Sequence, residues 1–222
     1  MGQKVRPTAF RVGIMEPWRS RWYASKREFA NLLVEDARIR DHVKRNYGQA
    51  GISRIDIERT RDEVTVRLFV ARPGIIIGRK GQEVDRLQDE LQRLTQRRIR
   101  ILIDEVAKPQ LDAQLVAEEI RAQLLRRANF RRVMKRAIDQ AMEAGALGVR
   151  VELAGRLGGA EMARREKMIR GSVPLQTLRA KISYGFALAV TPQGAIGIKV
   201  WINQGDYLLD REETSHADAK TR

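Results

Sequence analysis

The pattern of polar and apolar positions predicts a helix and two strands in the first part of the chain. Apolar residues recur near helical spacing from Ser25 to about Tyr47, and Gly48 follows them, which predicts a helix. Apolar residues then alternate with charged residues over 54–58 and with Thr65, Arg67 and Phe69 over 64–70, which predicts two strands joined by a turn at 60–62. The helix is expected to bury its apolar positions, which are Phe29, Leu32, Leu33, Ala37, Ile39 and Val43.

The same block continues with a short apolar turn, a second helix and a third strand. The turn begins at Pro73, and the strand covers about 98–103. Apolar residues of the second helix fall on one face, so we expect that face to be buried. Its members are Val84, Leu87, Leu91 and Leu94.

A second block begins after Lys108-Pro109, where proline interrupts the pattern. Two helices are predicted at about 111–127 and 131–144. Alternating stretches at 149–153, 178–184 and 196–202 follow them, and Thr191–Gly194 has turn chemistry suited to joining the last two strands. This order predicts an α+β domain with a mostly antiparallel sheet. The expected organisation is a basic arm at 1–16, a first domain at 17–108, the α+β domain at 109–205 and a flexible tail at 206–222.

The charge of the chain points to a polyanionic partner. There are 43 Lys+Arg against 28 Asp+Glu, a formal net charge of +15, and nucleic acid is the commonest partner for such an excess. Cysteine is absent and histidine occurs only at His42 and His216. Disulfide scaffolds, thiol nucleophiles and cysteine-based zinc sites are therefore excluded, and we expect no metal and no cofactor. The sequence has no apolar run of membrane-spanning length, so no membrane partner is expected.

Gly78-Arg79-Lys80-Gly81, between two predicted helices, is the sharpest local motif. Two glycines allow a sugar-phosphate chain to approach the backbone, and the two cations lie where phosphates would bind. The order of elements around the motif resembles the type II K-homology (KH) fold, whose loop of this kind grips single-stranded RNA. A merely basic turn is the simpler alternative. A nucleotide-binding P-loop is excluded, because Arg79 stands where that motif requires glycine and neither Ser nor Thr follows Lys80.

A dense run of basic residues follows between Arg121 and Arg136. The run has seven basic residues and no acidic one. On a helix, four of them share one side, opposite a predicted apolar side. A solvated helix face is the alternative, although such faces normally interleave glutamate with the cations. The four cations are Arg131, Arg132, Lys135 and Arg136, and the apolar positions are Val133, Met134, Ala137, Ile138 and Ala141.

Two further clusters have weaker signals. Basic residues between Arg156 and Arg170 lie in a glycine-containing segment, which suits a loop following an RNA surface or, equally, an ordinary solvated loop. Trp18, Trp22 and Tyr23 could stack on bases, but aromatic residues near the start of a helix more often pack, and we assign them to packing. We find no triad, paired-carboxylate or metal-ligand spacing that indicates a catalytic site.

Seven motifs in order resemble the bacterial-type family of small-subunit ribosomal protein number three, a universal ribosomal protein family with a type II KH domain. They cover nearly the whole chain and begin with MGQKVRPTAFRVG, SRWYA and IGRKG. FRRVMKRAI, GRLGGAEMAR, VPLQTLRAKISYG and GAIGIKVWI complete the set. Departures are small: Arg6 stands where histidine is common, and Thr8-Ala9 is atypical.

The resemblance implies a non-enzymatic RNA-binding component of the small-subunit head, located in cytoplasmic or organellar ribosomes. Its expected partners are small-subunit ribosomal RNA, messenger RNA and neighbouring head proteins, namely ribosomal proteins ten and fourteen. It also implies that Arg131, Arg132 and Lys135 line the channel through which messenger RNA enters and help to hold and unwind the message. The KH loop, Gly78–Gly81, is expected to face RNA. Further candidates for contacts with ribosomal RNA are Lys4, Arg6, Arg11, Arg127, Arg136, Arg156, Arg164 and Arg165.

Two other functions stay open at this point. The first is a free KH-type RNA-binding regulator or RNA chaperone, which the KH half alone would also fit. The second is a nucleic-acid-processing enzyme such as a lyase that uses an exposed lysine.

Overall fold

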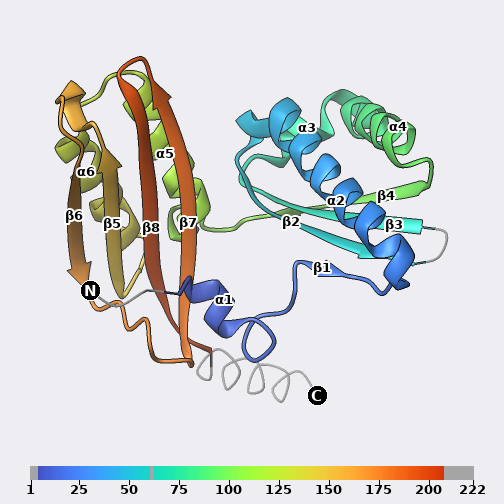
Figure 1. The fold of residues 1–222 in the computed structure, drawn as a ribbon, viewed down its shortest axis with the longest axis horizontal. Coiled ribbons are helices and arrows are strands. Elements are labelled where there is room, and N and C mark those ends of the chain that lie inside the picture. The colour runs from blue at the N-terminus through green and yellow to red at the C-terminus, as the bar shows by residue number, and fades with distance from the viewer. Residues whose placement is uncertain (1–4, 61–62, 208–222) are drawn as a thin grey trace. The chain divides into compact units, whose positions relative to one another are not determined.

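The computed structural model describes residues 5–60 and 63–207, which divide into two units (Figure 1). One unit spans Trp18–Ala107, and the other combines the chain before Trp18 with the chain after Ala107. Lys4, part of the turn predicted at 60–62 and the predicted tail beyond 207 lie outside the described residues, as does the side chain of Lys80.

The unit Trp18–Ala107 is a four-stranded sheet with helices packed on one side (Figure 1). Its strand order is β1-β2-β3-β4, in which β2 and β3 are antiparallel while β1 pairs with β2, and β3 with β4, in parallel. The parallel pair β3–β4 needs a crossover, which α3 and α4 supply. Apart from β1, which was not predicted, the elements follow one another along the chain in the order that the sequence predicted for a type II KH domain. The elements are β1 (Ser20–Arg21), α2 (Lys26–Tyr47), β2 (Ile52–Arg59), β3 (Glu63–Val70), α3 (Pro73–Ile77), α4 (Gln82–Thr95) and β4 (Arg98–Glu105).

Strand alternation and helix periodicity explain most of the core of this unit. The even-numbered residues of β3 from Val64 to Val70 are fully buried, and Ile39 and Val43 of α2 and Leu87 and Leu91 of α4 pack against the same core. The predicted helix faces were too wide, because a helix on one side of a sheet buries only a narrow stripe. Four predicted core residues are exposed instead: Phe29, Leu33, Ala37 and Leu94.

The second unit is a four-stranded, fully antiparallel sheet with two helices on one face (Figure 1). Its strand order is β6-β5-β8-β7. A two-residue turn, Pro192-Gln193, joins β7 to β8, and the Thr191 hydroxyl donates to the Gly194 carbonyl at 2.6 Å. The predicted helices and mostly antiparallel sheet are therefore confirmed. The elements are α1 (Pro7–Arg11), α5 (Ala113–Leu125), α6 (Phe130–Glu143), β5 (Gly148–Gly155), β6 (Arg164–Gly171), β7 (Ala180–Thr191) and β8 (Gly194–Asp206).

β6 corrects the sequence interpretation, which took this segment for a loop. Arg164–Gly171 pairs with β5 along its whole length and lies at the edge of the sheet. Only Met168 of this strand packs against the core, and most of its other residues are exposed. A charged edge strand resists pairing with other chains, and it lacks the apolar alternation by which strands are recognised.

The N-terminal segment is part of the second unit. Arg11 in α1 is fully buried, and its guanidinium donates to the carbonyls of Ala180 at 2.8 Å, Thr177 at 2.7 Å and Leu175 at 3.3 Å. Burial lowers the pKa of Arg11. The buried cation thereby fastens the start of the chain to the segment that leads into β7.

Candidate nucleic-acid interface

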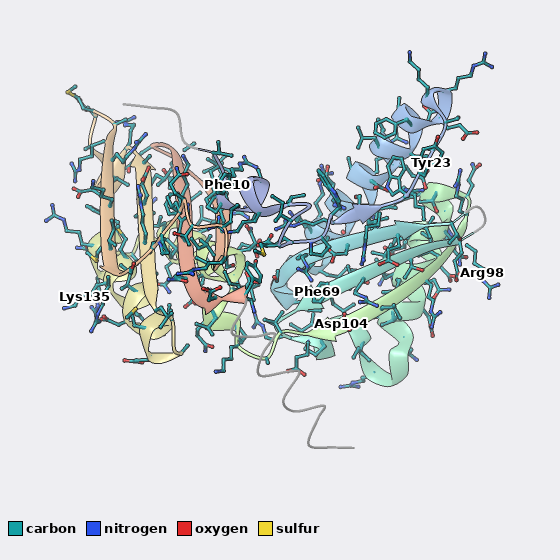
Figure 2. All side chains as sticks on the ribbon, turned by 90° about the horizontal axis from the view of Figure 1, so that it is seen from below. Phe10, Tyr23, Phe69, Arg98, Asp104 and Lys135 are labelled. Carbon is teal, nitrogen blue, oxygen red and sulfur yellow. The ribbon has the colours of Figure 1, made fainter. Side chains whose placement is uncertain are left out.

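Helix α6 presents an apolar face to the core and a cationic face to the solvent. Its first turn is capped by Asn129, whose side chain accepts from the Arg131 backbone N–H at 3.0 Å. The five predicted apolar positions, from Val133 to Ala141, are buried, as expected. The four predicted cations are all exposed, and Figure 2 shows Lys135 at the outer surface of its unit. We call Arg131, Arg132, Lys135 and Arg136 the cationic ridge.

The ridge has little compensating negative charge. Within the described part of the chain, Arg132, Lys135 and Arg136 form no ion pair, and Arg131 lies 3.8 Å from the Glu166 carboxylate. Glu166 is shared, because Arg164 lies 3.4 Å from the same oxygen. Like charges four residues apart on a helix cost about 0.2–0.5 kcal/mol per pair. This arrangement therefore costs stability unless an anion lies against it.

Basic residues before α6 extend the charge beyond the ridge. Arg121, Arg126 and Arg127 are exposed. Arg127 has φ 60°, in the left-handed region that few non-glycine residues adopt. Its backbone N–H donates to the Leu124 carbonyl at 2.9 Å, which closes the end of α5.

The KH loop, Gly78–Gly81, connects α3 to α4 and requires glycine at its start. Gly78 has φ 65° and ψ −167°, and a Cβ there would lie 2.6 Å from the Glu83 Cγ atom. Gly81 has φ 83° and precedes the first turn of α4. The Arg79 side chain is exposed. The space beside Gly81 is open, since no atom lies within 4 Å of the position that a Cβ would take there, whereas the Glu83 side chain fills the space beside Gly78.

Two neighbouring features of the KH loop shape what it can bind. Ile75 and Ile77 of α3 expose about two-fifths of their surface beside the loop, at 42% and 41%, and offer apolar contact to a base. The first turn of α4 carries Glu83 and Asp85. Their negative charge opposes a phosphate directly at that helix N-terminus, so a phosphate is better placed on the Arg79 side of the loop.

The remaining predicted contact residues are not equivalent. Arg11 is fully buried in backbone hydrogen bonds, so the prediction that it contacts RNA is wrong. Arg156 holds two loops together, with its Nε donating to the Ala160 carbonyl and one terminal nitrogen to the Gln193 carbonyl, both at 2.9 Å. Arg6 is exposed.

Arg164 and Arg165 point to opposite faces of β6, because side chains alternate along a strand. The Arg164 guanidinium lies 5.6 Å from the centre of the Phe130 ring, on the side of α6. Arg165 lies 3.2 Å from the buried Glu152 carboxylate on the other face. Only Arg164 therefore adds charge beside the ridge.

The aromatic residues before α2 do not all pack, which corrects the prediction. Trp22 does, since its indole N–H donates to Asp36 at 2.9 Å and its ring centre lies 5.2 Å from that of Phe29. Trp18 is 66% exposed and Tyr23 is 97% exposed, and Figure 2 labels Tyr23 near α2. These two rings are available for contact with another molecule.

A buried polar network in the KH unit escaped the sequence analysis. Asp36 and Arg59 are both buried, and the Arg59 Nε donates to the Asp36 carboxylate at 2.8 Å. Ser20 also donates to Asp36, at 3.2 Å, which fixes β1 to α2. The sequence did contain a signal for this network, because Asp36 falls on the buried stripe of α2 between Leu32 and Ile39, where a carboxylate needs a polar partner.

Asp56 in β2 is a second buried carboxylate. One of its oxygens has no hydrogen-bond partner, while the other lies 3.2 Å from the Arg54 guanidinium. Burial raises the pKa of Asp56, and the positive charge of Arg54 opposes that shift.

No cluster of three or more potential metal-ligating side chains occurs among the described residues. No helix in this part of the chain has both the length and the apolar content needed to cross a membrane.

Known proteins match both units. Residues 38–111 match the family described as KH domain, and residues 120–202 match Ribosomal protein S3, C-terminal domain. Small ribosomal subunit protein uS3 of Rhodopirellula baltica is 60% identical over 226 residues, covering 100% of this chain and 94% of the relative. The uS3 proteins of Desulforudis audaxviator and Syntrophobacter fumaroxidans are 54% and 56% identical, covering 95% and 94% of this chain and 97% and 100% of the relatives. Similarity of this extent over both units shows that the chain belongs to the family of small ribosomal subunit protein uS3.

Proposed function

We propose that this chain is a structural, non-catalytic component of the small ribosomal subunit that binds ribosomal RNA and guides messenger RNA into the ribosome. The cationic ridge carries this proposal. It is exposed along its length and is backed by a well-packed helix face, so that its charge is presented from a rigid support. Family membership supports the same function.

The geometry of the ridge suits the backbone of a single strand. Arg131 and Lys135 are four residues apart, which places them about 6 Å from each other along the helix axis. Arg132 lies next to them on the same exposed side. Three cations on a rigid helix can hold successive phosphates while the bases stay free, so strands of any sequence can pass. Holding one strand in this way favours the opening of a duplex ahead of it.

The KH loop provides a second RNA contact in the other unit. Gly81 leaves open space beside the backbone, and Arg79 supplies an exposed charge. We assign this contact to ribosomal RNA. Exposed Trp18 and Tyr23 in the same unit offer surface for the neighbouring head proteins, for which ribosomal proteins ten and fourteen are the proposed candidates.

The test replaces Arg131, Arg132 and Lys135 by alanine in ribosomes that translate a message with a stable hairpin. Translation through the hairpin should slow, whereas an unstructured message should be translated at the wild-type rate. The matched control replaces three exposed cations of the same unit that lie outside the ridge, Lys108, Lys167 and Arg179. Normal passage of the ridge variant through the hairpin would refute the proposed role.

Two simpler experiments separate the alternative functions. Sedimentation in a sucrose gradient should place the protein with small subunits, and its absence from those fractions would favour a free RNA-binding regulator. Incubation of the purified protein with RNA and with abasic DNA should leave both intact. Cleavage of either would indicate a nucleic-acid-processing enzyme.

A further inference from the structure

A cavity of about 370 Å³ lies beside the first turn of α6, in the second unit. Three connections surround it: the loop between α5 and α6, the turn at Leu157–Gly159 and the Pro192-Gln193 turn. We call this cavity the loop pocket. It includes the glycine-rich segment after Arg156, which belongs neither to the cationic ridge nor to the KH loop.

The loop pocket is held in shape by specific interactions. Arg156 joins two of its walls through hydrogen bonds of 2.9 Å to the Ala160 and Gln193 carbonyls. Gly159 has φ 83°, and a Cβ at that position would lie 2.6 Å from the Gln193 Oε1 atom. Glycine is therefore required for the Gln193 side chain to lie where it does.

The walls combine apolar surface with a few polar groups. Leu125, which is 46% exposed, lines the pocket together with Phe130 and Ile196. Gln193 and Arg127 supply polar atoms, and the Gln193 amide has no hydrogen bond within the described part of the chain. An amide can donate to and accept from the edge of a planar heterocycle, and apolar walls favour contact with its faces.

The pocket also adjoins the ridge. Phe130 is the first residue of α6 and directly precedes Arg131, whose guanidinium lies 5.6 Å from the centre of the Phe130 ring. A strand whose phosphates lie on the ridge can therefore turn one base into the pocket. The volume is at the small end of the roughly 300–1,000 Å³ range typical of ligand sites, which suits a single base.

We propose that the loop pocket binds one nucleobase of the single-stranded RNA whose phosphates lie on the cationic ridge. This inference rests on the proposed function, since it assumes that the ridge holds RNA. The pocket would add contact with a base to the cationic ridge, which otherwise contacts only phosphates. Because the pocket does not fit one kind of base closely, the Gln193 amide can rotate to form hydrogen bonds with any of the four bases.

The test compares oligouridine with an oligomer of equal length that has the same ribose-phosphate backbone but no bases. Binding is followed by fluorescence anisotropy at a single salt concentration. The wild-type protein should bind oligouridine roughly 5- to 150-fold more tightly, which is the range that stacking of one base provides. Two variants should reduce this preference: Gln193→Ala, which removes the amide, and Ala128→Trp, which fills the pocket from an exposed position.

The controls separate the pocket from the ridge. Gln123→Ala changes a glutamine of the same unit outside the pocket and should keep the full preference. Thermal denaturation should show that each variant is folded. As a second measurement, photo-crosslinking of an RNA that contains 4-thiouridine should label residues of the pocket wall in the wild type and fewer of them in Ala128→Trp.

Three outcomes would overturn the inference. Equal affinity of the wild type for both oligomers would show that only phosphates are bound. A preference for bases that survives in both pocket variants would place the base elsewhere. Pocket variants that bind oligouridine normally but fail to join the small subunit would assign the pocket to a protein neighbour. In each case, weaker RNA binding by the ridge variant would leave the proposed function intact.

Discussion

Replacing Arg131, Arg132 and Lys135 by alanine should reduce the salt dependence of RNA binding by an amount that the structure determines. Each cation that neutralises a phosphate of a single strand contributes about 0.7 to the slope of log K against log salt concentration. Arg132 and Lys135 form no ion pair within the described residues and should count in full. Arg131 lies 3.8 Å from Glu166 and should count in part.

The slope should therefore fall by about 1.4 to 2.1 in the triple variant. At about 0.1 M monovalent salt, the same term corresponds to a loss of roughly 25- to 130-fold in affinity. Folding should not suffer, because the three side chains are exposed. Removing the like-charge pair of Arg131 and Lys135 should even stabilise the helix by about 0.2–0.5 kcal/mol.

The assay titrates labelled single-stranded RNA with wild type and variant at several salt concentrations. The variant that lacks Lys108, Lys167 and Arg179 carries the same change in net charge and should keep a slope close to that of the wild type. An unchanged slope in the ridge variant would show that the ridge does not neutralise phosphates. Equal losses in both variants would show that net charge, rather than the ridge, determines affinity.

Four further predictions concern interactions and backbone geometry within each of the two units. Arg11→Met should loosen the N-terminal segment, because its buried hydrogen bonds are lost, and limited proteolysis should then cut ahead of the KH unit faster than in the wild type. Asp36→Ala should lower the free energy of unfolding by about 1.5–3 kcal/mol in urea denaturation, because the buried Arg59 loses its charge-assisted hydrogen bonds to Asp36 and keeps only the Glu35 carboxylate, 2.9 Å away; a change below a few tenths would contradict this. Asp56→Asn should raise the melting temperature at neutral pH, because burial raises the pKa of this carboxyl and its charged form costs stability above that pKa. That gain should vanish as the pH falls below the ordinary pKa of aspartate. Gly78→Ala should weaken RNA binding and cost about 1–2 kcal/mol of stability, because φ is 65° there; wild-type melting and affinity would argue against the required glycine.

Helix α6 was predictable because one local pattern determines both of its faces. Apolar residues at helical spacing indicate which side packs, and the cations must then occupy the other side. The KH order was predictable for a similar reason, since each element has its own period and the glycine motif marks a junction. Even so, packing on a sheet buries less of α2 than its apolar residues suggest, as exposed Phe29 and Leu33 show.

The features that sequence reasoning missed depend on distant partners. Arginine is usually found at the surface, so the sequence gives no reason to expect Arg11 to be buried. Its hydrogen-bond acceptors lie up to 169 residues further along the chain. β6 has charged residues on both faces, because it lies at an edge and gains its hydrogen bonds from β5 alone. Neither environment can be read from neighbouring residues. The loop pocket likewise forms only where three separate connections meet.

The burial of Arg11 has a consequence for the order in which the protein matures. A ribosome makes the chain from its N-terminus, so α1 emerges first, whereas its acceptors at Leu175, Thr177 and Ala180 are made only after the whole KH unit. The KH unit, with its own core, can fold while synthesis continues. The first residues of the nascent chain must wait as a basic, unpaired segment. Since β7 is joined to the sheet through β8, the synthesis of β8 is the step that closes the second unit around α1.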